Sequence, residues 1–279
     1  MKYYKEIELS TWEEYKELAE KSRLEWIFRG QSNSNWDLQT TLDRSGITTD
    51  FPEFEDELIR DFIRGAKFYL QAEQIPKSLL EWFSMIQHFG APSRLLDFTK
   101  SPYIAAYFAF EQATNEDIAI WIVDKIALFQ SSIYYFNDKI DYSSHTKYTF
   151  DDNTFDLVFE KSKEGEFDCV IPMEPKNTNQ RYHLQQSIFL CQGNPYQSII
   201  NQFEFIKKNL IDRTIIKVVI PSSEKKKAIR DLIKMNISRA SLFPGLDGFA
   251  KSLMMKYSNL STFGETHELL KYAVKKGIA

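Results

Sequence analysis

Two short polar segments of this sequence carry side chains that could do chemistry. In the first, Arg29 follows the apolar run Trp26 to Phe28 and precedes Gly30. A guanidinium at the end of a buried strand can hold a phosphate or carboxylate, and a glycine beside it leaves room for a ligand near the backbone. Gln31 and Trp36 add an amide and an aromatic face. The alternative is an ordinary strand-end arginine with an internal ion pair.

The second segment, from Gln87 to Thr99, holds an amide, an imidazole, a guanidinium and a carboxylate in a stretch interrupted by glycine and proline. Such a density of functional groups in a constrained loop is typical of a binding site. His88 could hold a ribose hydroxyl or move a proton, or serve in packing alone. In the other interpretation, Asp97 pairs with Arg94 and caps a helix that starts near Ser101.

Other classes of site find no support in the sequence. The four histidines and two cysteines, Cys169 and Cys191, have no metal-ligand spacing, so we expect no metal site and two buried reduced thiols. The sequence contains neither a Gly-x-Gly-x-x-Gly motif nor a P-loop. It therefore predicts neither a Rossmann cofactor site nor a P-loop ATPase.

Composition narrows the class of protein further. The 43% hydrophobic and 15% aromatic residues supply a large core. The net charge of −4 arises from 35 basic and 39 acidic residues in mixed order, so no global basic field would collect nucleic acid. No apolar run approaches the roughly 20 residues of a membrane span, and the N-terminus has no apolar signal core. We expect a cytoplasmic protein without membrane contact, and the oligomeric state stays open.

The elements that must position these groups follow from hydrophobic periodicity. The pattern predicts a strand at 26–28, with Arg29 where the sheet meets solvent, and a loop from Gly90 to Lys100 held between two helix ends. Segment 125–170 shows no sustained period and is interpreted as a peripheral insertion. These elements predict an α/β (α+β) fold with a central mixed sheet flanked by helices. Further helices are expected at 11–21, 51–71, 79–89, from 101 onward, 224–235, 246–256 and 267–276, and further strands at 118–123, 187–191 and 214–220.

The same segments resemble the signature blocks of the FRG-domain family, which is named after the tripeptide Phe-Arg-Gly. The similarity runs in order from about residue 26 to 255 and implies a single FRG domain over 1–279, with an N-terminal helix and a C-terminal helical tail. Ser187 departs from the pattern, since a glycine is expected there. The blocks that carry the resemblance are Phe28-Arg29-Gly30-Gln31, the segment Gln87 to Thr99, Ala105 to Ala109, Asn179-Gln180-Arg181 with Gln185, and Ser241 to Gly248.

The resemblance implies a bacterial protein suspected in phage defence or stress. Its first block is also similar to the strand-borne arginine of ADP-ribosyltransferases, which implies NAD as a possible substrate and a protein or nucleic acid as acceptor. The implied catalytic groups are Arg29, His88 and Asp97, although no Glu-x-Glu or Gln-x-Glu pair occurs near Gln185. The alternative is a non-catalytic module that binds a nucleotide or a nucleic-acid end. The implied NAD-binding residues are Arg29, Gln31, Arg94, Arg181 and Gln185.

A geometric prediction joins these groups. We expect Arg29, Arg94, Asp97 and Gln185 to lie around one concavity, with Gln185 on a strand that also carries Arg181, because polar groups in short bounded loops mark sites more often than cores. A placement of Arg29 and Asp97 on opposite faces of the sheet would exclude a shared site.

Overall fold

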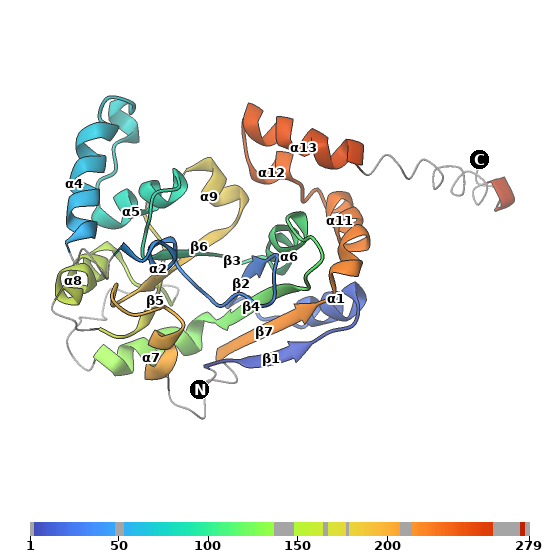
Figure 1. Ribbon diagram of the computed structural model, residues 1–279, viewed down its shortest axis with the longest axis horizontal. Coiled ribbons are helices and arrows are strands. Elements are labelled where there is room, and N and C mark those ends of the chain that lie inside the picture. The colour runs from blue at the N-terminus through green and yellow to red at the C-terminus, as the bar shows by residue number, and fades with distance from the viewer. Residues whose placement is uncertain are drawn as a thin grey trace.

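The computed structural model describes residues 3–47, 53–136, 148–163, 167–176, 179–206, 214–258 and 274–276. Within these ranges one seven-stranded sheet runs through the molecule in the order β1-β7-β4-β2-β3-β6-β5 (Figure 1). Strand β1 pairs with β7 in parallel, and the other neighbours are antiparallel. The predicted fold class, a central mixed sheet flanked by helices, is confirmed. The strands are β1 (Lys5–Glu8), β2 (Trp26–Gln31), β3 (Leu95–Thr99), β4 (Ile118–Asp124), β5 (Val170–Met173), β6 (Ser187–Gln192) and β7 (Ile215–Ile220).

The helices cover the sheet as two groups that Figure 1 shows on either side of the molecule. One group packs on β2, β4 and β7 and consists of α1 (Trp12–Glu20), α6 (Pro102–Glu111) and α11 (Lys225–Lys234). The other packs near β5 and β6 and consists of α4 (Phe54–Ala66), α5 (Leu79–His88), α7 (Lys125–Phe136) and α8 (Asp152–Ser162). The short helices α2 (Thr41–Ser45), α9 (Gln180–Leu184) and α12 (Arg239–Leu242) and the longer α13 (Leu246–Ser258) lie around the sheet, with 3-10 turns at Ala72–Gln74, Asn201–Phe205 and Ser222–Glu224.

Local sequence explains most of the boundaries. Thr11, Ser78 and Ser101 each accept a hydrogen bond from the backbone N–H three residues on and so begin α1, α5 and α6. Strand β4 is buried along almost its whole length, as its apolar run predicts. No helix in the described ranges is long and apolar enough to cross a membrane. The expected helix at 267–276 falls largely outside those ranges.

Several expectations for the elements are wrong. Strand β2 continues through Gln31, so Arg29 lies inside a strand and is half-buried. The second half of the expected loop from Gly90 to Lys100 is strand β3, because Leu95, Leu96 and Phe98 pack on both faces and β6 supplies the hydrogen bonds. Segment 125–170 is expected to be peripheral, but its helices α7 and α8 pack into the hydrophobic cluster beneath β5 and β6.

The sheet opens between β2 and β3, at its centre. These strands are paired at one position only, Phe28 with Thr99, whereas β2 pairs with β4 along six residues from Trp26 to Gln31. Beyond the single pair, the main chain of β3 no longer bonds the main chain of β2. The opening is the place where a pocket can enter the sheet.

Gly30 is required by helix packing. An added Cβ would lie 2.0 Å from the carbonyl oxygen of Ala105 and 2.7 Å from the backbone nitrogen of Ala109 in α6. The absent side chain therefore lets α6 lie directly on β2. The space where a Cβ would lie is thus filled by the helix backbone and not open to a ligand, although Gly30 also lines the pocket described below.

Candidate functional site

A pocket of about 500 Å³ lies at the opening between β2 and β3. Residues of both sheet faces border it, since Phe108 belongs to α6 on one face while segment 36–44 packs on the other through Leu38. Of the predicted site residues, the pocket is lined by Arg29, Gln31, Asp97, Arg181 and Gln185. Its other polar and aromatic lining includes Trp36, Asp37, Gln39, Arg44, Thr99, Gln112, Ser187 and Phe243.

Arg29 spans the opening. Its Nη1 donates to the main-chain oxygen of Asp97 at 2.7 Å, and its Nε is buried without a hydrogen-bond partner among the described residues. Burial lowers the pKa of the Arg29 guanidinium, Asp97 opposes that shift and Arg44 adds to it. A buried guanidinium is stabilised in its charged form by any anion that comes close to it.

Asp97 is exposed on β3, and its Oδ2 accepts a hydrogen bond from Gln87 Nε2 of α5 at 2.9 Å. The pairing of Phe28 with Thr99 places the Asp97 side chain on the face of α5 and α6, and that of Arg29 on the other face, because side chains alternate along a strand. Their side chains thus point to opposite faces of the sheet, the outcome named above as excluding a site shared by these two groups. Both residues nevertheless line one pocket.

Arg181 and Gln185 lie on α9 and its C-terminal cap, so the expected strand is a helix. The Arg181 guanidinium carbon lies 4.5 Å from the centre of the Phe243 ring. Gln185 is buried, its Nε2 donates to the main-chain oxygen of Leu242 at 3.1 Å, and its main-chain oxygen accepts from Thr99 Oγ1 at 2.7 Å. Gln185 thus joins α9 to β3 and α12 and fixes the wall that carries Arg181.

His88 borders a smaller pocket of about 50 Å³ that shares Asp97, Arg181 and Gln185 with the larger one. The imidazole is half-buried at the end of α5 and contacts Phe89 edge to face. Burial lowers the pKa of His88, Arg181 lowers it further and Asp97 opposes them. The neutral imidazole is therefore favoured, and it can accept or donate a hydrogen bond beside the larger pocket.

Both polar groups of the Gln31 side chain are already hydrogen-bonded within the protein. Its Nε2 donates to the main-chain oxygen of Asp37 at 3.0 Å, and its Oε1 accepts from Trp121 Nε1 at 2.6 Å. The amide holds the segment after β2 against β4. Gln31 therefore forms part of the pocket wall, and its amide groups are not available to a ligand because both already have hydrogen-bond partners.

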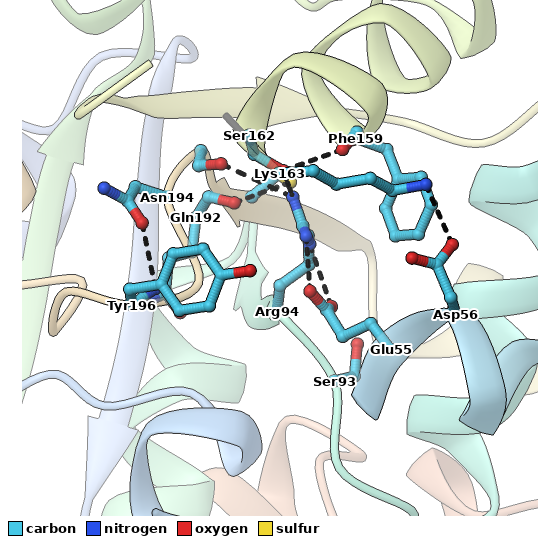
Figure 2. Close-up of polar contacts among 12 residues, drawn as sticks. Glu55, Asp56, Ser93, Arg94, Phe159, Ser162, Lys163, Gln192, Asn194 and Tyr196 are labelled. Atoms are coloured by element: carbon cyan, nitrogen blue, oxygen red, sulfur yellow. Dashed lines mark hydrogen bonds and ion pairs between the residues drawn. The ribbon is translucent and has the colours of Figure 1, made fainter. Parts of the chain in front are cut away.

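Arg94 does not reach the pocket, and the expectation that it lies around the same concavity is wrong. Its side chain is 1% exposed and forms a bidentate ion pair with Glu55 of α4, in which Nε donates to Oε1 at 2.9 Å (Figure 2). Its Nη1 donates to Ser162 Oγ at 3.0 Å, and the guanidinium lies over the Phe159 ring. The proposed pairing of Arg94 with Asp97 is wrong for the same reason. Arg94 ties β3 to α4 and α8.

Sequence reasoning missed two charged residues of the pocket. Arg44 is exposed on α2, a five-residue helix, and its Nη1 donates to the main-chain oxygen of Gln39 at 2.9 Å. Asp37 follows Trp36 on the segment after β2. The capping box formed by Thr40 and Asp43 was the available signal for α2. Among the described residues, no three His, Cys, Asp or Glu side chains are grouped to hold a metal ion.

Comparison with known proteins gives one finding. Residues 24–118 match the family model of the FRG domain, a segment that includes β2, β3, α5 and α6 and with them Arg29, His88 and Asp97. No curated protein and no solved structure gives a significant match.

Proposed function

Because residues 24–118 of this chain match the FRG-domain family model, we propose that its pocket binds a phosphate-bearing nucleotide, with NAD as the candidate. One observation carries the proposal. The guanidinium groups of Arg29, Arg44 and Arg181 border a single pocket, and in the described part of the chain none of them forms a salt bridge. Guanidinium groups bind phosphate oxygens through directed, charge-assisted hydrogen bonds.

The size and the aromatic lining agree with a nucleotide. Ligand pockets commonly enclose about 300–1,000 Å³, and this one encloses about 500 Å³. Trp36, which is 53% exposed, and Phe243 both line the pocket. An exposed indole can stack on a base or a nicotinamide ring.

In the enzymatic form of the proposal, the pocket promotes ADP-ribosyl transfer. The bond between nicotinamide nitrogen and ribose C1′ breaks, its electron pair leaves with nicotinamide, and an acceptor nucleophile attacks C1′ and loses a proton. Arg29 and Arg181 would hold the phosphates, while Asp97 would stabilise the positive charge on the ribose or take the acceptor's proton. His88, kept neutral, would hold a ribose hydroxyl.

A second candidate is a non-catalytic module that binds a nucleotide or a nucleic-acid end. The described residues that line the pocket include Asp37 and Asp97 but no glutamate, whereas ADP-ribosyltransferases commonly use a glutamate at the ribose. The basic groups would then bind a terminal phosphate, without bond cleavage.

Calorimetric titration with NAD, ADP-ribose, ADP and a short single strand bearing a terminal phosphate tests binding. Mass spectrometry of protein incubated with NAD tests for released nicotinamide and added ADP-ribose. Binding of NAD with release of nicotinamide supports the enzyme, and binding without release supports the module. If none of the four ligands binds, the nucleotide proposal is wrong.

A cytoplasmic role as an effector in bacterial defence or stress follows from the family resemblance alone. Phage challenge of cells that produce the wild-type chain or Arg29→Ala tests it. Protection that requires Arg29 supports the role, and equal plaque counts in both strains contradict it.

A further inference from the structure

Two arginines contact the same aromatic ring beside the pocket. The guanidinium carbon of Arg181 lies 4.5 Å from the centre of the Phe243 ring, and that of Arg239 lies 4.6 Å from it. Both distances are within the range of cation–π attraction. Phe243 and Arg181 line the pocket, whereas Arg239 is not part of its lining.

The two arginines differ in what their N–H groups contact. Arg239 Nη1 donates to Glu111 Oε2 at 2.8 Å, in a largely buried ion pair. For Arg181, no side-chain hydrogen bond or ion pair is formed with the described residues, and its guanidinium is placed by the ring and by the field of Asp97. Burial lowers the pKa of Arg181, Asp97 opposes the shift and Arg239 adds to it.

The ring itself is held firmly. Gln185 Nε2 donates to the oxygen of the preceding residue, Leu242, and Phe108 meets the Phe243 ring edge to face with centres 6.0 Å apart. An added Cβ on Gly248 would lie 1.9 Å from the Phe243 carbonyl oxygen, so α13 packs directly on this backbone. These contacts leave Phe243 little freedom to move.

We infer that Phe243 is a positioning residue for Arg181, holding the flat guanidinium against a fixed ring so that its N–H edge stays available to an anionic group of the ligand. An ion pair would hold an arginine equally well but would occupy that edge and neutralise its charge. An aromatic ring contacts the flat face of the guanidinium and leaves its N–H edge available. Because the guanidinium is already held in place, less side-chain entropy is lost when a ligand binds. The inference deepens the nucleotide-binding proposal and rests on it for the identity of the ligand.

Substitution of the ring tests the role in binding. Phe243→Leu keeps an apolar side chain without a π face, and we expect ADP-ribose affinity to fall roughly three- to thirtyfold, the range of a cation–π contact. Phe243→Tyr keeps the ring and should retain most of the affinity. In an Arg181→Ala background, Phe243→Leu should cause little further loss, because the two changes remove one interaction. Phe249→Leu, on an exposed ring of α13 outside the pocket lining, is the matched control.

A measurement without ligand tests the geometry separately. In nitrogen-labelled protein, the Nε–Hε resonance of Arg181 should carry a ring-current shift that Phe243→Leu removes and Phe243→Tyr keeps. Thermal melting of each variant identifies any that fail to fold. These data stand even if the probe nucleotide does not bind.

The outcomes separate the two proposals. If ADP-ribose binds wild type and Arg181→Ala weakens it while Phe243→Leu does not, the positioning role is wrong and the nucleotide site stands. If no nucleotide binds but the ring-current shift depends on Phe243, the placement of Arg181 is supported and the nucleotide proposal fails. An Arg181 resonance unaffected by Phe243→Leu overturns the inference in either case.

Discussion

Arg29 donates from Nη1 to the main-chain oxygen of Asp97 at 2.7 Å, across the opening between β2 and β3. The guanidinium thus supplies a hydrogen bond at a point where the two strands no longer pair with each other. Arg29 serves the scaffold through this bond, while its buried Nε has no hydrogen-bond partner in the part of the chain that the structure describes. Its two roles can be separated by experiment.

Arg29→Lys keeps the charge and loses the planar guanidinium. If Arg29 also holds a ligand phosphate, we expect nucleotide affinity to fall on the order of tenfold to hundredfold. Loss of the bond to the Asp97 oxygen should lower Tm by about a few degrees. Titration calorimetry and thermal melting measure the two effects.

Arg23→Lys is the matched control, because Arg23 is exposed and its contact with Asp124 is long, at 3.9 Å. It should change neither quantity. A variant of Arg29 with full nucleotide binding and a clearly lower Tm would assign Arg29 to the scaffold alone.

Asp97→Asn tests the enzymatic form of the proposed function. An amide oxygen can still accept the hydrogen bond from Gln87, so Tm should change little. NAD should bind as well as before or more tightly, because a negative charge near the phosphates is removed. Nicotinamide release should fall on the order of a hundredfold or more if the carboxylate acts in the reaction. Unchanged release from Asp97→Asn, with a loss in Asp37→Asn, would transfer the role to Asp37.

Gly30→Ala should destabilise the protein strongly. The new methyl group would overlap the backbone of α6 at Ala105, and backbone atoms cannot move aside cheaply. We expect a loss of about 3 kcal/mol or more in the free energy of unfolding. Gly65→Ala is the control, since Gly65 lies within α4 with open space around it, and it should stabilise by about 0.5–1 kcal/mol. Urea unfolding measures both, and equal effects would contradict the packing of α6 on β2.

Arg94→Met should act on stability and leave binding intact. It leaves Glu55 as an uncompensated buried charge, which commonly costs about 3–5 kcal/mol. The double variant Arg94→Met with Glu55→Met should lose less, because no unpaired charge remains. Nucleotide affinity of the folded fraction should equal that of wild type. A selective loss of binding without loss of stability would return Arg94 to the ligand site.

His88 should make stability depend on pH. Because burial lowers its pKa below the ordinary 6.5, the unfolded chain binds the proton more readily than the folded chain. The His88 contribution is therefore present above pH 6.5 and is lost as pH falls through the lowered pKa. His88→Gln should remove this slope. Urea unfolding over that pH range tests the prediction, and equal slopes in the two proteins would contradict it.

Residues with strong periodicity or clear caps were predictable. The apolar run of β4 and the capped patterns of α5 and α6 indicated those elements within a residue or two. Strand β3 was not predictable. Leu95 and Leu96 are both buried but face opposite sides of the sheet, and the hydrogen bonds of β3 come from β6, a strand about 90 residues later. Alternation within so short a segment cannot show which distant strand will pair with it.

The site was predictable in part. Arg29, Asp97, Arg181 and Gln185 line one pocket, as the motifs predict, but the side chains of Arg29 and Asp97 point to opposite faces of the sheet. Arg94 was misassigned because its partner Glu55 is 39 positions away in a helix whose sequence shows only an amphipathic pattern. The alanines at 105 and 109 were a signal for the close approach of α6 to Gly30. Small residues four positions apart lie on the same face of a helix, so that face can approach another backbone closely.

The strand order sets a limit on where this protein can be divided. The segment that matches the family includes β2 and β3, but their long ladders run to β4 and β6, and these strands lie almost entirely beyond residue 118. A fragment cut at the matched boundaries would keep Arg29 and Asp97 and lose the strands on either side of them. Its two central strands would share a single residue pair and expose their outer edges to self-association. We therefore expect that residues 24–118 of this chain do not fold alone, and that the pocket depends on strands outside the matched segment.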